Sequence, residues 1–317
     1  MKKIFSLMAA LLSAFVFSCA AFADSPYTES DAIDFVYIVK QDGTAVIRDY
    51  YGRISGELII PSEIDGYTVT EIGSYCFDYD SGLTSVTVPE TVTVIGAYAF
   101  QHCYGLETIN LSEGLAEIQE GAFQSCLFVQ QVDIPDSVTS LGCRTFKDCT
   151  YLGNVTIGSG INYIHEETFE GCGMLENIVL GENVRIIGSY AFASTDVRNI
   201  YIPKSVERIE NNAFSGCYNM LVSYGGGQAQ WDKISIRYNN DGLEEAEIKY
   251  FMNPDGTVDQ KAKNAGLIAL TVYISIVVLL IVLVILVLAR KKSGVCSHCN
   301  AVLEDGAEFC GNCGTKL

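Results

Sequence analysis

The sequence predicts a solenoid of stacked coils, mainly β with short helical or 3₁₀ turns. Two observations predict it: phenylalanine recurs with five gaps of 23 residues and a last gap of 22, and a β-branched strand pattern repeats at the same interval. Each repeat carries too few apolar residues to bury a core alone, so only the stack has one. The repeated phenylalanines are Phe77, Phe100, Phe123, Phe146, Phe169, Phe192 and Phe214.

The net charge of the chain limits the partners that it can be expected to bind. The chain has 317 residues and 12 cysteines, and residues 24–264 hold 35 acidic and 14 basic side chains, a net charge of −21. Such an acidic surface argues against nucleic acid and anionic lipid as partners. Solubility is the plainest explanation of the charge.

Residues 1–23 have the pattern of an export signal. Two lysines precede the apolar run Ile4–Phe17, and Ala21-Phe22-Ala23 is a small-x-small cleavage site. The alternative is lipid attachment at Cys19. That signal requires a small residue two positions before the cysteine, where this chain has Phe17.

Residues 24–57 lie outside the period and are expected to cap the solenoid. Phe35–Val39 and Ala45–Tyr50 have strand composition and flank an Asp-Gly pair, which favours a tight hairpin turn. The open end of a solenoid core needs such an atypical first unit.

The repeats are expected to occupy residues 58–220. In each one, an apolar, often β-branched residue is followed two positions later by another apolar residue, which predicts a strand with one buried face. A proline, serine or glycine then ends the strand, a second short apolar pair follows, and the phenylalanine fills the centre of the coil. The first buried strand positions are Val86, Ile109, Val132, Val155, Ile178 and Ile200.

Aligned on phenylalanine, the units read L-x-x-I-x-I-P and then V-x-x-I-G-x-x-A-F-x-x-C, and they resemble the BspA-like leucine-rich repeats of bacterial surface proteins. The resemblance covers about Leu58 to Met220. It implies a right-handed, curved leucine-rich-repeat solenoid with a parallel sheet on one face, a cell-surface location, and binding rather than catalysis. Gln119, His165 and Glu210 depart from it by replacing the bend glycine.

Five cysteines take the same position in their coils, and between the first and the last of them only the coil after Phe192, which is one residue short, lacks one. Coils stacked at about 5 Å would bring neighbouring sulfurs within reach of a disulfide. Equivalent side chains point in parallel, however, and a disulfide needs specific torsion angles, so we expect a buried ladder of free thiols. The five are Cys103, Cys126, Cys149, Cys172 and Cys217.

The outward positions of the strands form a row of short, mostly uncharged polar side chains. On a concave face such a row could bind an extended peptide or glycan by hydrogen bonds. A plain solvated sheet is the alternative. The candidate ligand-face residues are Asn110, Gln131, Asn154, Asn177, Asn199 and Tyr201.

The period fails after Met220. Residues 221–251 are expected to form a closing cap, with a short helix from Gln228 to Ile234, a strand near Ala246–Phe251, and Trp231 packed over the last coil. Residues 252–264 have the composition of a linker. The 13 linker residues reach at most about 45 Å, so the repeats are expected to stay close to the apolar segment at residues 265–289.

Residues 265–289 contain no charge over 25 residues, and Arg290-Lys291-Lys292 follow. A helix of that length, about 37 Å, can cross a bilayer core of about 30 Å. The positive-inside rule and the export signal together predict a single-pass protein in the cell membrane, with extracellular repeats and a cytoplasmic tail at residues 290–317.

The tail contains two C-x-x-C pairs separated by ten residues. Two such pairs form a tetrahedral four-thiolate site, and the segment resembles the short zinc ribbons of bacterial proteins. Structural Zn²⁺ is therefore the expected cofactor. A redox dithiol is the alternative, disfavoured because four ligands satisfy zinc fully and the cytoplasm keeps thiols reduced. The ligands are Cys296, Cys299, Cys310 and Cys313.

No nucleophile, metalloprotease or phosphate-loop motif accompanies the three histidines, so no enzyme activity is expected. The sequence favours a membrane-anchored surface protein that binds a protein or glycan partner near the membrane. The alternative is a transmembrane sensor whose zinc ribbon docks a cytoplasmic protein. A passive structural envelope protein is a third hypothesis.

Overall fold

The computed structural model describes residues 34–290, 294–303 and 307–317. The predicted export signal, including Cys19, lies outside the described residues. The chain divides into two compact units, Met1–Asp259 and Gln260–Leu317. Each unit is described by itself.

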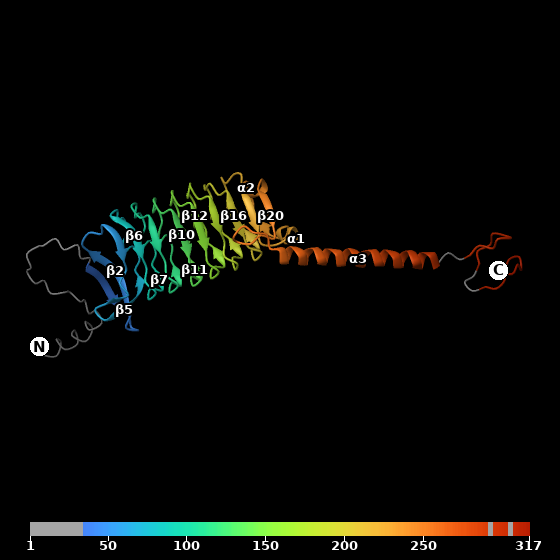
Figure 1. Ribbon diagram of the computed structural model, residues 1–317, viewed down its shortest axis with the longest axis horizontal. Coiled ribbons are helices and arrows are strands. Elements are labelled where there is room, and N and C mark those ends of the chain that lie inside the picture. The colour runs from blue at the N-terminus through green and yellow to red at the C-terminus, as the bar shows by residue number, and fades with distance from the viewer. Residues whose placement is uncertain (1–33, 291–293, 304–306) are drawn as a thin grey trace, which may run out of the picture. The chain divides into compact units, whose positions relative to one another are not determined.

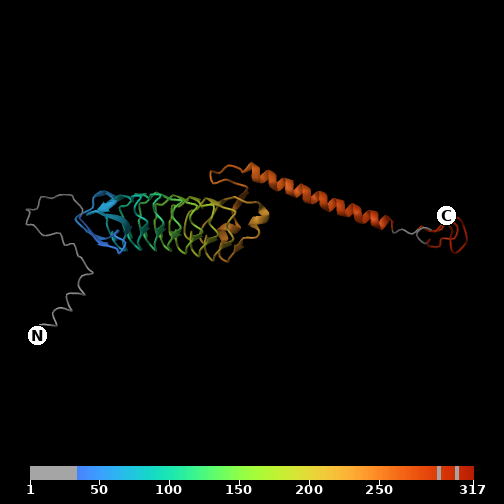
Figure 2. The same cartoon turned by 90° about the horizontal axis from the view of Figure 1, so that it is seen from below.

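The first unit is a stack of coils (Figures 1 and 2). Each repeat contributes one long strand, and these strands pair in parallel with their neighbours, except between β8 and β10. The predicted buried positions face inward: Val132, Val155 and Ile178 pair in register and are at most 2% exposed. The long strands are β3 (Gly56–Ile59), β6 (Leu83–Thr87), β8 (Thr108–Asn110), β10 (Gln131–Ile134), β12 (Asn154–Ile157), β14 (Asn177–Val179), β16 (Asn199–Ile202), β18 (Leu221–Tyr224) and β20 (Glu247–Tyr250).

A second row of shorter strands returns the chain on the opposite side of the coil. They also pair in parallel, in two groups that part between β11 and β13. Only two residues of most repeats take part in this row, since the chain must turn again to reach the phenylalanine. The short strands are β5 (Tyr67–Ile72), β7 (Val94–Ile95), β9 (Glu117–Ile118), β11 (Ser140–Leu141), β13 (Tyr163–Ile164), β15 (Ile186–Ile187), β17 (Arg208–Ile209) and β19 (Ser235–Ile236).

The repeated phenylalanines form one continuous column through the core. All seven are at most 1% exposed, and successive rings stack with centroids 5.0–5.5 Å apart. Such aromatic pairs stabilise by about 0.5–1.5 kcal/mol beyond the burial of their area. From Phe77 to Phe192, the backbone N–H of each phenylalanine also donates to a carbonyl of the next coil, as Phe146 does to Thr168 at 2.9 Å. The column therefore links every coil to its neighbours.

The cysteine ladder consists of free thiols, as expected. Each thiol donates to the backbone oxygen of a phenylalanine in the preceding coil, with Sγ···O distances of 3.0–3.2 Å. Burial raises the pKa of the Cys149 thiol to about 12, so this thiol stays protonated and able to donate. The ladder thus adds one hydrogen bond for each of its five cysteines, and it is interrupted in the coil of Phe192, where Thr195 takes this position.

Each phenylalanine lies between two residues with left-handed backbone, one two positions before it and one two positions after. Around Phe100 these are Tyr98, with φ 57°, and His102, with φ 58°. Most of these positions are not glycine, although the left-handed region costs other residues about 1–2 kcal/mol. The corner that inserts phenylalanine into the core is therefore maintained by packing on both sides.

The N-terminal cap is the predicted hairpin. Strands β1 (Asp34–Val39) and β2 (Ala45–Tyr51) pair antiparallel, and β2 continues in parallel to β5, which also pairs with β4 (Glu63–Ile64). The Tyr50 ring stacks on Phe77 with centroids 5.3 Å apart, and its hydroxyl donates to Asp80. The hairpin thereby closes the phenylalanine column at its first ring.

The C-terminal cap contains helices α1 (Gln228–Trp231) and α2 (Asp241–Glu244). Trp231 is 8% exposed and packs edge-on against Tyr224, as predicted. The Asn240 side chain is buried and makes the hydrogen bonds that the backbone of a further coil would otherwise make. Its side-chain oxygen accepts from the N–H of Phe214 at 3.0 Å, while its amide donates to the carbonyl oxygens of Glu210 and Arg237.

The linker predicted at residues 252–264 is shorter in the structure. Met252 bridges Val258, the Asp259 N–H donates to the carbonyl of Phe251, and residues between them form a turn. The last five residues of the predicted linker belong to helix α3 (Gln260–Arg290). Glutamine, lysine and alanine at its start are good helix formers and extend the apolar helix backward.

The second unit contains α3 and the cysteine-rich segment. Among the described residues, α3 is the one helix that is long and apolar enough to cross a membrane, and its apolar stretch is not buried inside the protein.

Candidate metal centre and repeat face

The two C-x-x-C pairs fold into two copies of one local structure. In the first, the N–H of Asn300 donates to the Cys296 carbonyl at 2.8 Å; in the second, Gly314 donates to Cys310 at the same distance. Asn300 and Gly314 both have left-handed backbone, with φ of 57° and 72°. A short bridge closes each copy, one between Val295 and Val302 and the other between Phe309 and Lys316.

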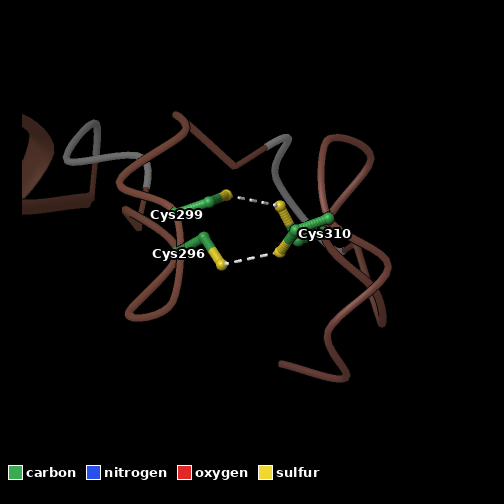
Figure 3. A group of neighbouring side chains, drawn as sticks. Cys296, Cys299 and Cys310 are labelled. Carbon is green, nitrogen blue, oxygen red and sulfur yellow. Dashed lines mark hydrogen bonds between the residues drawn. The ribbon is translucent and has the colours of Figure 1, made fainter.

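The two turns bring four sulfurs together (Figure 3). The Sγ atoms of Cys296 and Cys313 are 3.6 Å apart, those of Cys299 and Cys310 are 3.5 Å apart, and all four lie within 4.8 Å of one another. A disulfide would need about 2.05 Å. Four sulfurs around a tetrahedral ion with bonds of about 2.3 Å would be about 3.8 Å apart. The geometry therefore fits metal ligation by all four predicted cysteines.

Hydrogen bonds lower the pKa of two of these thiols, whereas at Cys310 the lowering by a backbone hydrogen bond at Cys313 is outweighed by burial and by the hydrogen bond with Cys299, which raise the pKa of this thiol to about 11. A hydrogen bond with the Thr315 hydroxyl lowers the pKa of the Cys313 thiol to about 6, and a backbone hydrogen bond at Ala301 lowers the pKa of Cys299. Thiolate is the form that binds metal. His298 is exposed between the first two ligands and is not part of the cluster.

The predicted ligand-face residues lie in two rows on the long strands. Gln131, Asn154, Asn177 and Asn199 pair in register along β10, β12, β14 and β16. Three of them form an asparagine ladder: the Asn177 amide donates to Asn154 and the Asn199 amide to Asn177, both at 2.9 Å. Asn110 lies in the adjacent row and donates to Thr87 at 3.1 Å. Part of the polar capacity of this face is therefore used between coils.

Tyr201 is not available on this face, contrary to the prediction. It is 5% exposed, and its hydroxyl donates to Glu182 at 2.6 Å. Burial, followed by that bond, raises the pKa of the Tyr201 phenol. Gly225 shows why: a Cβ added there would lie 2.7 Å from the Tyr201 hydroxyl, so the chain of the closing cap passes over the ring. Strand alternation places Tyr201 outward, and the cap then covers it.

A groove interrupts the long-strand face where β8 and β10 fail to pair. It has a volume of about 380 Å³ and contains two of the predicted ligand residues, Asn110 and Gln131. Nothing in the sequence marks the interruption, because the spacing from Cys103 to Ile109 equals that from Cys126 to Val132. The lining residues are Glu107, Thr108, Ile109, Asn110, Leu111, Gln130, Gln131 and Asp133.

The coils and the cysteine site define a repeat solenoid followed by a small metal-binding module, and comparison with known proteins agrees. The family of the BspA type leucine rich repeat region matches residues 70–194 and 129–221, with six copies. The zinc-ribbon domain family matches residues 295–317. The chain therefore contains a BspA-type leucine-rich repeat region and a zinc-ribbon domain.

Several solved structures are similar to the chain. A leucine-rich repeat protein of T. pallidum is 26% identical over 59% of this chain and 87% of its own, with a TM-score of 0.44. One from Bacteroides ovatus is 23% identical over 73% and 72%, with a TM-score of 0.43. One from Bacteroides capillosus is 32% identical over 38% and 91%, with a TM-score of 0.33. A search of the curated proteins found no match.

Proposed function

We propose that this protein is a membrane-anchored bacterial surface receptor whose repeats bind a protein partner close to the membrane, without catalysis. The observation that carries the proposal is the grooved polar face on a solenoid with both ends capped. Preformed concave sites with a few placed polar groups are the usual form of ligand sites. A glycan is the other ligand class that such a face can hold.

The anchoring part of the proposal depends on α3. Its length and composition suit a single membrane span, and the basic residues 290–292 favour a cytoplasmic location for the residues that follow. The turn at residues 252–259 uses up most of the expected linker, which favours recognition near the bilayer over reach to another cell.

Affinity capture tests the binding function. Residues 34–259 form a compact unit with its own core and caps, so a fragment of residues 24–259 is a suitable bait for solubilised envelope proteins and glycans. We expect one saturable partner that the full chain also captures. Capture of no envelope component by either form would refute the binding proposal.

Protease treatment of intact cells tests the topology. We expect an epitope inserted in the repeats to be digested and one following Leu317 to be protected until the cells are lysed. Protection of the repeat epitope, or digestion of the tail in intact cells, would contradict the proposed orientation.

The four-cysteine site is proposed to hold one structural Zn²⁺. Four thiolates are a typical zinc donor set and leave no open coordination position for a substrate. The residues present therefore fit a closed site, whose role is to fold the ribbon.

A second function, coupling to a cytoplasmic protein, is favoured by the ribbon's surface. Four of its large apolar side chains are 48–74% exposed. So many exposed apolar side chains in so short a segment are unusual and favour a protein contact. In-cell cross-linking from the tail tests this: a specific protein lost on Phe309→Ser would support sensing, and an unchanged background would support display alone. The four are Val295, Val302, Phe309 and Leu317.

A further inference from the structure

The groove between β8 and β10 leaves main-chain hydrogen-bonding groups unpaired. In neighbouring coils the ladder extends past the strand ends: Glu107 N–H donates to Thr84, and Gly153 N–H donates to Gln130. The equivalent bond from Gln130 to Glu107 is missing among the described residues. At the other strand end, the Val88 N–H donates to Asn110, and the described residues contain no equivalent bond from Leu111.

Unpaired strand edges are the usual docking place for an extended peptide. The amide of Gln130 and the carbonyl of Glu107 lie on residues that line the groove and have no main-chain partner across it. A ligand with its own amide groups can satisfy both. The broken ladder is therefore an observation, independent of side-chain chemistry, that favours a peptide ligand.

The side chains of the groove select for positive charge. Its lining includes the carboxylates of Glu107 and Asp133, and the remaining polar side chains are hydroxyl or amide. No lysine, arginine or histidine lines it. A guanidinium or ammonium group would find carboxylate and amide acceptors there, while an anionic ligand would be repelled. The net charge of −21 over residues 24–264 adds long-range attraction for such a ligand.

The turns that lead into the long strands carry an exposed apolar row. Tyr104 and Phe128 each lie in the turn just before a strand that borders the groove, and Tyr151 and Met174 continue the row over the next coils. They are 39–52% exposed. The rings of Phe128 and Tyr151 stack on each other at 5.1 Å, which covers one face of each. Aromatic and methionine side chains of this kind suit a protein contact better than sugar stacking on free ring faces.

We propose that the groove binds an extended basic segment of a partner protein, with arginine or lysine side chains held by Glu107 and by Asp133. The partner's main chain pairs with the unsatisfied groups of β8 and β10, and its flanking apolar residues contact the row that begins at Tyr104. This inference rests on the binding function proposed above and names its site and ligand class.

Fluorescence anisotropy with the full chain in detergent tests the inference. The probes are three labelled ten-residue peptides of alternating valine with arginine, glutamine or glutamate. We expect saturable binding of the arginine peptide alone, weakened as salt rises. Glu107→Gln with Asp133→Asn should weaken it about tenfold or more. Glu90→Gln with Glu113→Gln is the matched control, since these exposed carboxylates lie on neighbouring coils outside the groove.

A charge-reversal variant tests whether the charge of the groove determines which peptide binds. Glu107→Lys with Asp133→Lys should bind the glutamate peptide in preference to the arginine peptide, and both substitutions are at exposed positions, so folding should survive. Equal binding of all three peptides, or equal loss in the control pair, would overturn the inference. If the envelope partner captured by residues 24–259 binds the neutralised variant normally, the groove assignment fails while the binding function stands.

Discussion

The solenoid and the ribbon offset the conformational entropy that an ordered chain loses by different means. The solenoid orders its chain by burying one phenylalanine and its neighbours in every coil, so each coil is stabilised by the next. In the ribbon, Cys296 and Cys310 are the only buried side chains among those described. The solenoid is held by packing that is distributed along the chain, whereas the proposed zinc site would hold the ribbon through four metal–thiolate bonds alone. Perturbations should therefore spread differently in the two.

Metal removal should give the largest effect, and it should be confined to the ribbon. A structural four-thiolate zinc site contributes about 10–16 kcal/mol at neutral pH, far more than the ribbon's apolar burial can replace. We expect Cys310→Ala, or a strong chelator, to unfold residues 294–317 completely and leave the repeats unchanged. NMR of the tail and circular dichroism of the full chain measure the two parts separately.

His298→Ala is the control for the ribbon, because His298 lies between two ligands but outside the cluster. It should retain one zinc per chain. A ribbon that stays folded in chelator with all four thiols reduced would show that ligation does not hold it.

Removing one ring from the phenylalanine column should have the next largest effect. Phe146 is fully buried between Phe123 and Phe169, with ring centroids 5.5 Å away on either side. Phe146→Ala leaves a cavity and should lower the free energy of unfolding by about 3–5 kcal/mol. Urea unfolding of residues 24–259 measures this change. Because each coil supports the next, we expect the midpoint of the whole unfolding transition to fall.

Phe128→Ala is the matched control, since Phe128 is 47% exposed on a turn of the same region. Its cost should stay near 0.5 kcal/mol, as for most surface substitutions. Equal costs for the two variants would contradict a packing-dominated solenoid.

The features that the sequence predicts are those that repeat. A fixed interval forces equivalent residues into equivalent environments, so the core positions and the cysteine ladder follow from counting. The metal site follows for a similar reason, because two adjacent C-x-x-C pairs leave few arrangements other than shared ligation. Both inferences need only local spacing.

Features that depend on how a particular coil meets its neighbour are not visible in the spacing. The groove between β8 and β10 interrupts repeats of equal length, and Tyr201 is covered only because the closing cap crosses it. The left-handed corners are equally hidden, since residues such as Tyr98 and Glu167 do not usually adopt that backbone. Tertiary packing overrides local preference at all of these places.

The smallest predicted effect concerns Asn240, whose side chain satisfies backbone groups of the last coil. Asn240→Ala would leave the Phe214 N–H and the Arg237 carbonyl oxygen without these partners, while the Glu210 carbonyl oxygen would keep the Ala213 N–H at 3.4 Å. Unsatisfied buried groups cost about 1–3 kcal/mol each, but water can reach a terminal coil, so we expect a total near 2 kcal/mol. Hydrogen exchange should speed up in the last two coils and not near Phe77. Asn162→Ala, at an exposed position, is the control. Uniformly faster exchange along the solenoid would contradict this, because it would mean that the Asn240 hydrogen bonds resist global unfolding of the stack rather than local fraying of its last coils.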